Sequence, residues 1–351
     1  MALKRGALIG CGFFSVNHLQ AWRDIEGVEI VALCDVDAGR LKLLGDQFAI
    51  ADRYTDADAL FAAGGFDFVD VATTVDSHLE LVMLAAEHKV PVICQKPFAK
   101  DLKTAGMMVN AAEEAGIPLM VHENFRWQVP IQAVKRTLDS GEIGTPFWGR
   151  FSFRSGYDVF ANQPYLAEGE RFIIEDLGIH VLDIARYLMG DVLSATARTS
   201  RINPSIAGED VATVLLDHVT GYSSVVDCSY ASKLENDPFP QTLIEIDGSL
   251  GTIRLSNDYQ VMVSTQAHGH IQSRQEDVAP PLLSWAEKPW HGIQHSVFAI
   301  QSHWIDCLEN TLEPATSGED NLKTLALVEA AYQSASTGKL INTEKLLAEC
   351  D

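Results

Sequence analysis

Basic residues are few in this sequence: 26 Lys and Arg stand against 48 Asp and Glu, which gives a formal net charge of −22 over 351 residues. A surface this acidic repels the phosphates of nucleic acids and anionic membranes, so neither is expected as a partner. The chain also lacks the run of about 18 apolar residues that a membrane-spanning helix needs. Residues 1–5 lead into a strand-like run without the apolar region or cleavage site of a signal peptide.

Cysteine is scarce and scattered, with six residues and no Cys-x-x-Cys pair. Cys11, Cys34 and Cys94 lie in or beside apolar strand-like runs, where free cysteine packs as a small apolar side chain. A disulfide framework or a zinc knuckle is therefore not expected, and no metal site is predicted. This pattern is typical of a reduced, cytoplasmic protein.

The composition itself is that of an ordinary globular protein, with 47% apolar residues, and the length suits two domains. Up to about residue 123, short apolar runs alternate with amphipathic stretches such as 78–88. This alternation is typical of βαβ units and of a parallel sheet covered by helices on both faces. We therefore predict an α/β domain over residues 1–123, with strands at 6–9, 29–33, 66–71, 91–94 and 118–121.

The pattern changes after residue 123, where strand-like runs follow one another without helices between them. The turn signals Asp247-Gly248 and Asn257-Asp258 separate some of these runs. Consecutive strands favour a largely antiparallel sheet, so we predict an α+β domain over residues 124–351. Its expected strands are 147–153, 211–216, 223–230, 242–246, 251–255 and 260–263, and its expected helices are 131–138, 293–308 and 321–336.

Two glycines follow the first predicted strand and precede the first helix. In a dinucleotide-binding fold, a glycine at Gly10 permits the tight turn and one at Gly12 lets the backbone approach the pyrophosphate. Ser15 stands where a third glycine is usual. Asp35 ends the second strand, where a carboxylate would bind the ribose hydroxyls of NAD and repel a 2′-phosphate. The alternative is that Asp35 is only a turn residue.

Two further segments carry candidate catalytic groups. Lys96, followed by a proline, lies at the carboxyl edge of the predicted parallel sheet, where ligands of open α/β folds bind. Asp176, His180 and Asp183 have the spacing of one helix face. A carboxylate beside an imidazole can tune a general base. The alternatives are a capping Asp with a structural His, and a metal site, which lacks a third ligand at recognisable spacing.

Aromatic and polar residues gather in the loops and strands of the second predicted domain, at 123–127, 154–157, Trp285 and Trp290-His291. Individually, such residues are more often part of the core or of an interface. Together they could form the walls of a site for a polyhydroxylated substrate, because a sugar has both apolar faces and hydrogen-bonding edges.

These segments resemble the glucose–fructose oxidoreductase / inositol dehydrogenase (Gfo/Idh/MocA) family over essentially the whole chain. The family usually has Glu where this chain has Gln95, and Pro-Asn where it has Thr74-Val75. The matching segments are Gly10–Phe14, Ala72–Thr74 with His78, Gln95–Pro97, Asn124 with Arg126, Gly141–Gly144 and Asp176–Asp183.

The resemblance implies an N-terminal Rossmann domain and a C-terminal open-faced sheet that forms a homo-oligomer, a dimer or a tetramer. It implies NAD-dependent oxidation of a sugar or polyol, in which His180 takes the proton of the sugar hydroxyl, Lys96 holds or shuttles it, and Asp176 orients the pair. The implied cofactor residues are Gly10, Gly12, Phe13, Phe14, Asp35, Thr73, Thr74, His78, Gln95, Lys96 and Asn124. The implied substrate residues are Lys96, Asn124, Arg126, Arg154, Tyr157, Asp176 and His180.

Within the family, residues 93–97 and 121–128 are most similar to members that oxidise a branched pentose at its anomeric carbon to the lactone. The resemblance leaves three other functions open: a dehydrogenase of another sugar or of inositol, a glycosidase that retains NAD, and a non-catalytic sensor of sugar or nicotinamide. Lys96, Asp176 and His180 argue against the sensor, because a binding protein needs no acid–base residues.

Overall fold

The computed structural model describes residues 3–161, 163–267 and 269–348, which divide into two compact units. The first unit groups the residues up to Asn124 with Val297–Leu322. The second groups Phe125–Ser296 with the residues from Lys323 on. Each predicted domain is one continuous stretch of sequence, whereas the first unit also includes Val297–Leu322 from the C-terminal part of the chain. The boundary between the two functional domains after residue 123 stays a prediction.

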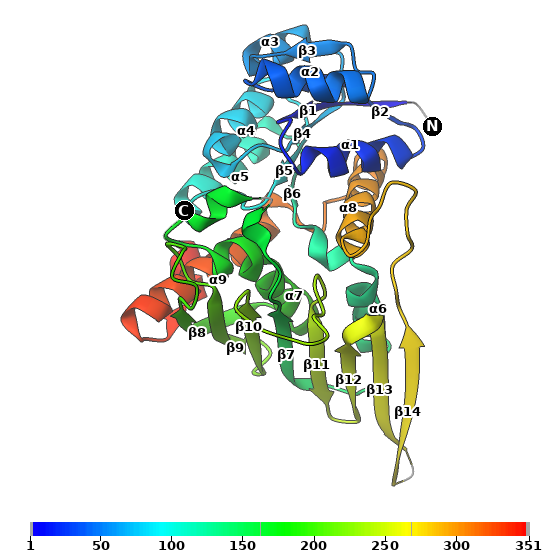
Figure 1. Cartoon of the computed structure of the whole chain (residues 1–351), viewed down its shortest axis with the longest axis vertical. Coiled ribbons are helices and arrows are strands. Elements are labelled where there is room, and N and C mark those ends of the chain that lie inside the picture. The colour runs from blue at the N-terminus through cyan, green and yellow to red at the C-terminus, as the bar shows by residue number, and fades with distance from the viewer. Residues whose placement is uncertain (1–2, 162, 268, 349–351) are drawn as a thin grey trace. The chain divides into compact units, whose positions relative to one another are not determined.

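The first unit contains a six-stranded parallel sheet in the order β3-β2-β1-β4-β5-β6 (Figure 1). This is the strand order of a Rossmann fold, and it confirms the predicted α/β class. The strands are β1 Lys4–Ile9, β2 Val28–Cys34, β3 Asp52–Tyr54, β4 Phe68–Val71, β5 Val92–Gln95 and β6 Leu119–His122. The helices between them are α1 Ser15–Asp24, α2 Ala38–Gln47, α3 Ala57–Ala63, α4 His78–Glu87 and α5 Leu102–Ala115.

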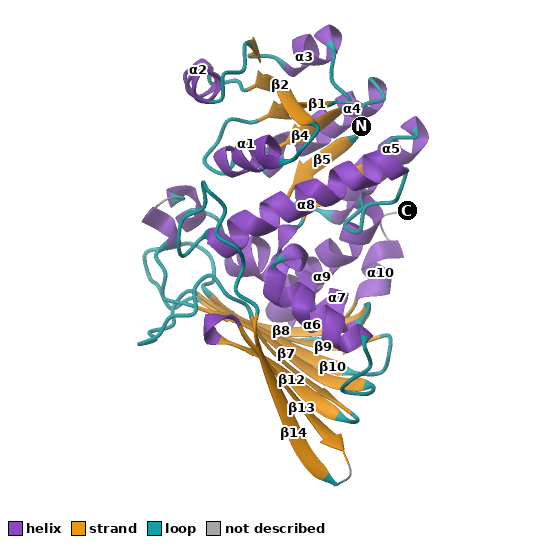
Figure 2. Ribbon diagram, turned by 90° about the vertical axis from the view of Figure 1, so that its right-hand side faces the viewer, coloured by secondary structure: helices purple, strands orange, loops and turns teal. Residues whose placement is uncertain are grey.

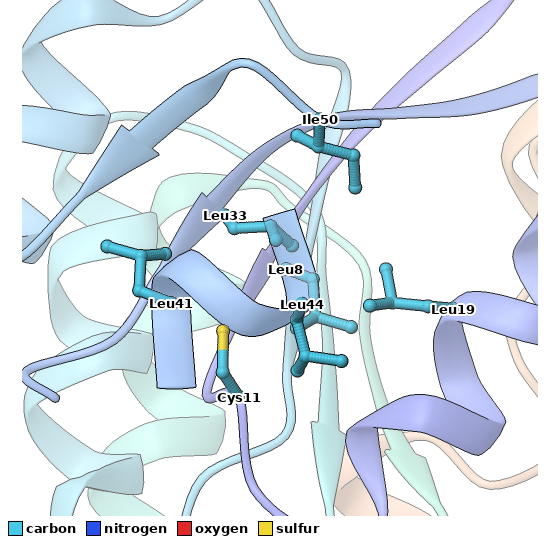
Figure 3. Packing of buried hydrophobic residues seen from close by; sticks show 7 residues of the cluster. All are labelled: Leu8, Cys11, Leu19, Leu33, Leu41, Leu44 and Ile50. Atoms are coloured by element: carbon cyan, nitrogen blue, oxygen red, sulfur yellow. The ribbon is translucent and has the colours of Figure 1, made fainter. Parts of the chain in front are cut away.

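A core of aliphatic side chains and one cysteine holds the first two strands to the first two helices (Figure 3). Leu8 of β1 and Leu33 of β2 are completely buried in it. Cys11, which lies between the two glycines after β1, also points into this core. The packing of Cys11 in this core therefore holds the glycine loop in place. The remaining members of the cluster are Leu19, Leu41, Leu44 and Ile50.

The segment Val297–Leu322 completes the first unit from a distant part of the sequence. It comprises most of α8 (His291–Asn310) and the start of α9 (Gly318–Thr337). Trp304 is fully buried, and its ring lies edge-on to Phe68 with centroids 6.5 Å apart. The Thr316 hydroxyl donates to the Val121 carbonyl at 2.7 Å, and the Val121 amide donates to the Thr316 carbonyl at 2.8 Å. These contacts bind the segment to β4 and β6.

The second unit contains a nine-stranded sheet in the order β14-β13-β12-β11-β7-β10-β9-β8-β15. Only the β7–β10 pair is parallel among these neighbours, which confirms the predicted α+β class. The strands are β7 Pro146–Arg154, β8 Val192–Ser200, β9 Val211–His218, β10 Ser223–Ser229, β11 Leu243–Gly248, β12 Gly251–Ser256, β13 Gln260–Ala267, β14 His270–Asp277 and β15 Ile341–Asn342.

Helices α6 (Val129–Asp139) and α7 (Ile179–Met189) pack on one face of this sheet (Figure 2). The last described element is the short helix α10 (Thr343–Ala348). Side chains on the other face are more exposed: along β9, residues alternate between buried and exposed, and Leu215 is 45% exposed. Asp247-Gly248 was predicted as a turn but ends β11, and the turn lies two residues later. Asn257–Tyr259 forms the expected turn between β12 and β13.

Candidate active site

The glycine loop after β1 has the backbone geometry that the sequence predicts. Gly10 has φ +101°, and a Cβ there would lie 2.7 Å from the Ala72 carbonyl oxygen. A Cβ at Gly12 would meet no atom within 4 Å, so the backbone at Gly12 is open to a close approach. The Ser15 hydroxyl donates to the Gly10 carbonyl at 2.6 Å and braces the loop. This loop, followed by the start of α1, fits the pyrophosphate of a dinucleotide.

Asp35 connects the end of β2 to the glycine loop. Its Oδ2 accepts from the Cys11 amide at 2.5 Å, and its Oδ1 accepts from the Asp37 amide at 2.7 Å. Asp35 is therefore more than a turn residue. Burial, and secondarily the charge of Asp35, raises the pKa of the Cys11 thiol to about 12, so this thiol stays neutral. Phe13, on the outer side of the loop, is 61% exposed, whereas Phe14 lies edge-on to His18.

The loop after β4 carries the predicted cofactor residues Thr73, Thr74 and His78. Thr73 is half-buried and Thr74 is exposed. His78 is fully buried, with its ring nitrogens 3.1 Å from the Phe98 carbonyl oxygen and 3.2 Å from that of Thr73. Burial lowers the pKa of His78, although both carbonyls act to raise it. His78 therefore ties the Thr73 loop to the segment that follows Lys96.

Lys96 follows β5 and is half-buried, and Asn124 follows β6 and is buried. The Gln95 Oε1 accepts from the Lys96 amide at 2.7 Å. Because β1, β4, β5 and β6 are parallel, their carboxyl ends lie at one edge of the sheet. The fold thus gathers the glycine loop, the Thr73 loop, Lys96 and Asn124 at one edge of the first unit.

His180 lies in the first turn of α7, in the second unit, and is 5% exposed. Its imidazole stacks face to face on the Phe125 ring, with centroids 3.9 Å apart and planes 4° apart. The stacking fixes the plane of the ring and leaves its edge to form hydrogen bonds.

Asp176 lies in a π-helical turn, Ile174–Gly178, that directly precedes α7. The expected helical pattern from Asp176 to Met189 is therefore continuous, but its first turn is π-helical, with more residues per turn than an α-helix. The pKa values of Tyr230 and Tyr165 are raised first by burial and then by the charge of Asp176. Both phenols thus lie within reach of the Asp176 charge.

Asp183 is directed to Arg126. Its two oxygens accept from the Arg126 guanidinium at 2.5 and 2.7 Å, and Oδ1 also accepts from the Thr324 hydroxyl at 2.7 Å. Arg126 and Asp183 are both buried, and the guanidinium lies over the Tyr187 ring. The ion pair holds α7 in place. A contact between Arg126 and substrate stays a prediction.

Some of the predicted aromatic residues come together. The Tyr157 ring stacks on Phe239 with centroids 4.0 Å apart, and Trp290 lies edge-on to both rings. Phe239 was missed by the sequence analysis, although it lies in the turn-rich segment Asp237–Pro240. Arg154, at the end of β7, has a side chain that is 42% exposed and lies 3.5 Å from Asp227.

Sequence reasoning also missed His18 and Asp70, which are fully buried and 2.8 Å apart. The sequence signal that could have identified this pair is Asp70 itself, a charged residue inside the otherwise apolar strand Phe68–Val71. Among the described residues, no group of three or more His, Cys, Asp or Glu side chains could hold a metal ion. In the described part of the chain, no helix is both long enough and apolar enough to cross a membrane.

Comparison with known proteins identifies two matching family models. An oxidoreductase family with an NAD-binding Rossmann fold matches residues 4–123, and a GFO/IDH/MocA C-terminal domain matches residues 131–254. A D-apiose dehydrogenase of Rhizobium rhizogenes is 65% identical over 99% of both chains. A D-apiose dehydrogenase of Paraburkholderia graminis is 61% identical over 98% of this chain and 91% of its own.

A similar fold is found in a crystal structure of an oxidoreductase from Agrobacterium radiobacter in complex with NAD+, L-tartaric acid and magnesium. It has a TM-score of 0.96 and 64% sequence identity, over 99% of this chain and 100% of that one.

Proposed function

Because the chain belongs to the Gfo/Idh/MocA oxidoreductase family, with its NAD-binding Rossmann domain, we propose that it oxidises D-apiose at the anomeric carbon to D-apionolactone. The observation that carries the proposal is the sequence identity of 65% and 61% with two D-apiose dehydrogenases, over 99% and 98% of this chain. The presence of Lys96, Asp176 and His180 supports a catalytic protein over a sensor.

The first unit supplies the groups that would bind the cofactor. The amides of the glycine loop and of the start of α1 bind the pyrophosphate, and the Asp35 carboxylate accepts hydrogen bonds from the adenosine ribose. The chemistry that NAD+ supplies when bound is acceptance of a hydride. Thr73, Thr74, Gln95 and Asn124 line the edge of the sheet at which the nicotinamide would lie.

Proton transfer in this proposal belongs to three side chains. His180 takes the proton of the anomeric hydroxyl, and the Phe125 ring holds the imidazole in one plane. Asp176 stabilises the imidazolium that forms, and Lys96 holds or shuttles the proton. An imidazole suits this role, because a histidine side chain ordinarily takes up and releases a proton between pH 5 and 8.

The second unit supplies surfaces that suit a small sugar. The rings of Tyr157, Phe239 and Trp290 offer apolar faces, and Arg154 offers hydrogen bonds to hydroxyls. We also propose a homo-oligomer that forms through the exposed face of the nine-stranded sheet, since Leu215 and Met262 are exposed there. The five described cysteines are free and buried, which supports a reducing, cytoplasmic location.

The test is a panel of sugars and inositols incubated with the purified protein and NAD+. D-Apiose should give the highest kcat/KM, with a net rise in NADH and a lactone as the product. A higher kcat/KM for an inositol would contradict the proposed substrate. Cleavage of a glycoside without a net rise in NADH would show a glycosidase instead.

A further inference from the structure

A line of buried polar side chains runs through the first unit to the backbone of Lys96. Asp70 on β4 and His18 on α1 have no exposed surface. The Trp22 indole donates to Asp70 Oδ2 at 2.7 Å, and His18 Nδ1 lies 2.8 Å from the same oxygen. His18 Nε2 lies 3.4 Å from the Gln95 side-chain amide, whose oxygen accepts from the Lys96 amide at 2.7 Å.

The chemistry of these groups determines which atom donates and which accepts in each hydrogen bond. A carboxylate only accepts hydrogen bonds, so Nδ1 of His18 donates to Asp70. In a neutral imidazole the other nitrogen, Nε2, then accepts, and the amide group of Gln95 donates to it. The Gln95 oxygen is left to accept from Lys96. Glutamine at this position is therefore matched to its neighbours, because it has both a donor and an acceptor.

We propose that His18 and Asp70 are positioning residues for Lys96 and that they act through Gln95. The inference rests on the proposed function, in which Lys96 handles the substrate proton. The hydrogen bonds fix the Gln95 side chain, which in turn fixes the backbone at the end of β5 from which Lys96 extends. Groups that orient a functional residue in this way typically change activity by about 10–100-fold when altered.

The groups facing His18 come from four elements. Asp70 lies on β4 and Gln95 on β5. Trp22 lies on α1, and Phe14 is the N-cap residue of α1. The His122 ring of β6 stacks on His18 with centroids 4.3 Å apart. Cys94 of β5 lies near Asp70, and because burial raises the pKa of its thiol, it adds no charge.

The informative variant is Gln95→Met in the full-length enzyme, because it removes both the donor and the acceptor of the Gln95 side chain at nearly constant size. The hydrogen bonds to His18 Nε2 and from the Lys96 amide are then both lost. If His18 acts on Lys96 through Gln95, a change at His18 should have little further effect on turnover once Gln95 is replaced.

The experiment measures kcat with NAD+ and D-apiose for wild type, His18→Leu, Gln95→Met and the double variant. Each single variant should lower kcat by about tenfold. The double variant should be little slower than the slower single variant, because both changes interrupt the same hydrogen bonds. His18→Gln, whose amide keeps a donor and an acceptor, should recover part of the kcat lost in His18→Leu.

Independent effects, in which the kcat losses of the two single variants multiply in the double variant, would overturn the proposal. Wild-type kcat in either single variant would overturn it as well. If His18→Leu does not fold, His18→Asn takes its place in the same comparison, and multiplied losses there overturn the proposal in the same way.

His218→Gln is the matched control, since this imidazole is also buried and hydrogen-bonded at both nitrogens, to Gly190 and Ser224. Any change that it causes in kcat should be the same in the wild-type and Gln95→Met proteins, because His218 lies in the second unit and contacts Gly190 and Ser224. Failure of the proposed function looks different: Lys96→Ala would then keep wild-type turnover, or D-apiose would not be oxidised by the wild-type protein at all.

Discussion

At the residue scale, we expect the carboxylate of Asp35 to decide which cofactor fits. It lies at the end of β2, bonded to the glycine loop through the Cys11 amide. NAD+ should be strongly preferred over NADP+, because a 2′-phosphate would approach this carboxylate. Asp35→Ser should relax the preference, measured as the ratio of the two kcat/KM values, by roughly 1–3 kcal/mol.

Asp56→Ser is a suitable control for the loss of one negative charge. Asp56 lies in the same unit and accepts from the Ala59 amide at the start of α3. It should leave the cofactor preference unchanged. Equal kcat/KM values for NAD+ and NADP+ in the wild-type protein would contradict the assignment of Asp35.

His180 and Lys96 should behave as one proton-transfer unit. His180→Ala should lower kcat by about 10²–10⁴ with NAD+ affinity nearly intact, and Lys96→Ala should lower kcat at least as much. The double variant should be little worse than the worse single variant, because both side chains act on one proton. Turnover of the three variants by steady-state kinetics measures this.

Melting temperatures of the same preparations separate catalysis from structure. If His180 were only a buried imidazole stacked on Phe125, His180→Ala would lower Tm and spare the turnover of the folded protein. Phe125→Leu removes the stacking ring but keeps its bulk. It should reduce kcat less than His180→Ala does.

At the scale of elements, the pair Arg126–Asp183 fixes α7. Both groups are buried, and removal of Arg126 takes away the cation whose guanidinium donates to both oxygens of Asp183, while the Arg186 guanidinium is 3.8 Å away. Arg126→Met should destabilise the protein by about 3–5 kcal/mol in denaturant unfolding, and Arg126→Met/Asp183→Leu should recover much of that loss. The control is the more exposed i,i+4 pair Lys135–Asp139, for which Lys135→Met should cost at most about 1 kcal/mol. An unchanged stability of Arg126→Met would show that the ion pair does not hold α7.

His218 gives the second unit an acid sensitivity. Burial lowers its pKa, although the Gly190 carbonyl acts to raise it. The unfolded chain, with a histidine pKa of about 6.5, therefore takes up a proton first as the pH falls. Stability that is present above about pH 6.5 is lost as the pH falls through the lower value of the folded protein. Tm measured from about pH 7.5 to pH 5 should fall less steeply in His218→Gln than in wild type. His88→Gln, at an exposed imidazole, should keep the wild-type slope.

Elements with a strong local pattern could be predicted from the sequence, and elements that depend on distant partners could not. The strands β1, β4, β5 and β6 are mostly apolar and mostly buried. In contrast, β3 is three residues at a sheet edge, and the residues of β14 are mostly polar and all exposed. Such strands exist because a neighbouring strand offers hydrogen bonds.

The same distinction applies to the candidate site. Gly10, Asp35 and Lys96 are identified by their places after strands. The pairing of His18 with Asp70, 52 residues apart, and of Asp183 with Arg126, 57 apart, depends on how the chain folds. The π turn at Asp176 is also invisible to spacing, because residues 174–178 continue a regular helical pattern.

At the scale of the whole molecule, the exposed face of the nine-stranded sheet should determine the oligomeric state. Leu215→Glu places a charge on that face, in the middle of β9, and should shift the protein to a smaller species in light scattering with Tm of the subunit little changed. Val219→Glu is the control, because Val219 is equally exposed but lies in the turn after β9. An unchanged mass for Leu215→Glu would place the contact elsewhere.

The return of Val297–Leu322 to the first unit sets the order in which the protein can be made. A ribosome completes all six strands of the parallel sheet, which end at His122, about 180 residues before it makes Trp304, which packs on Phe68. Until Thr316 is synthesised, the Val121 carbonyl and amide lack the hydrogen bonds that Thr316 forms with them in the folded protein. The nascent parallel sheet therefore has one flank uncovered while strands β7 to β14 of the second sheet are synthesised. This interval is when chaperones would be most needed.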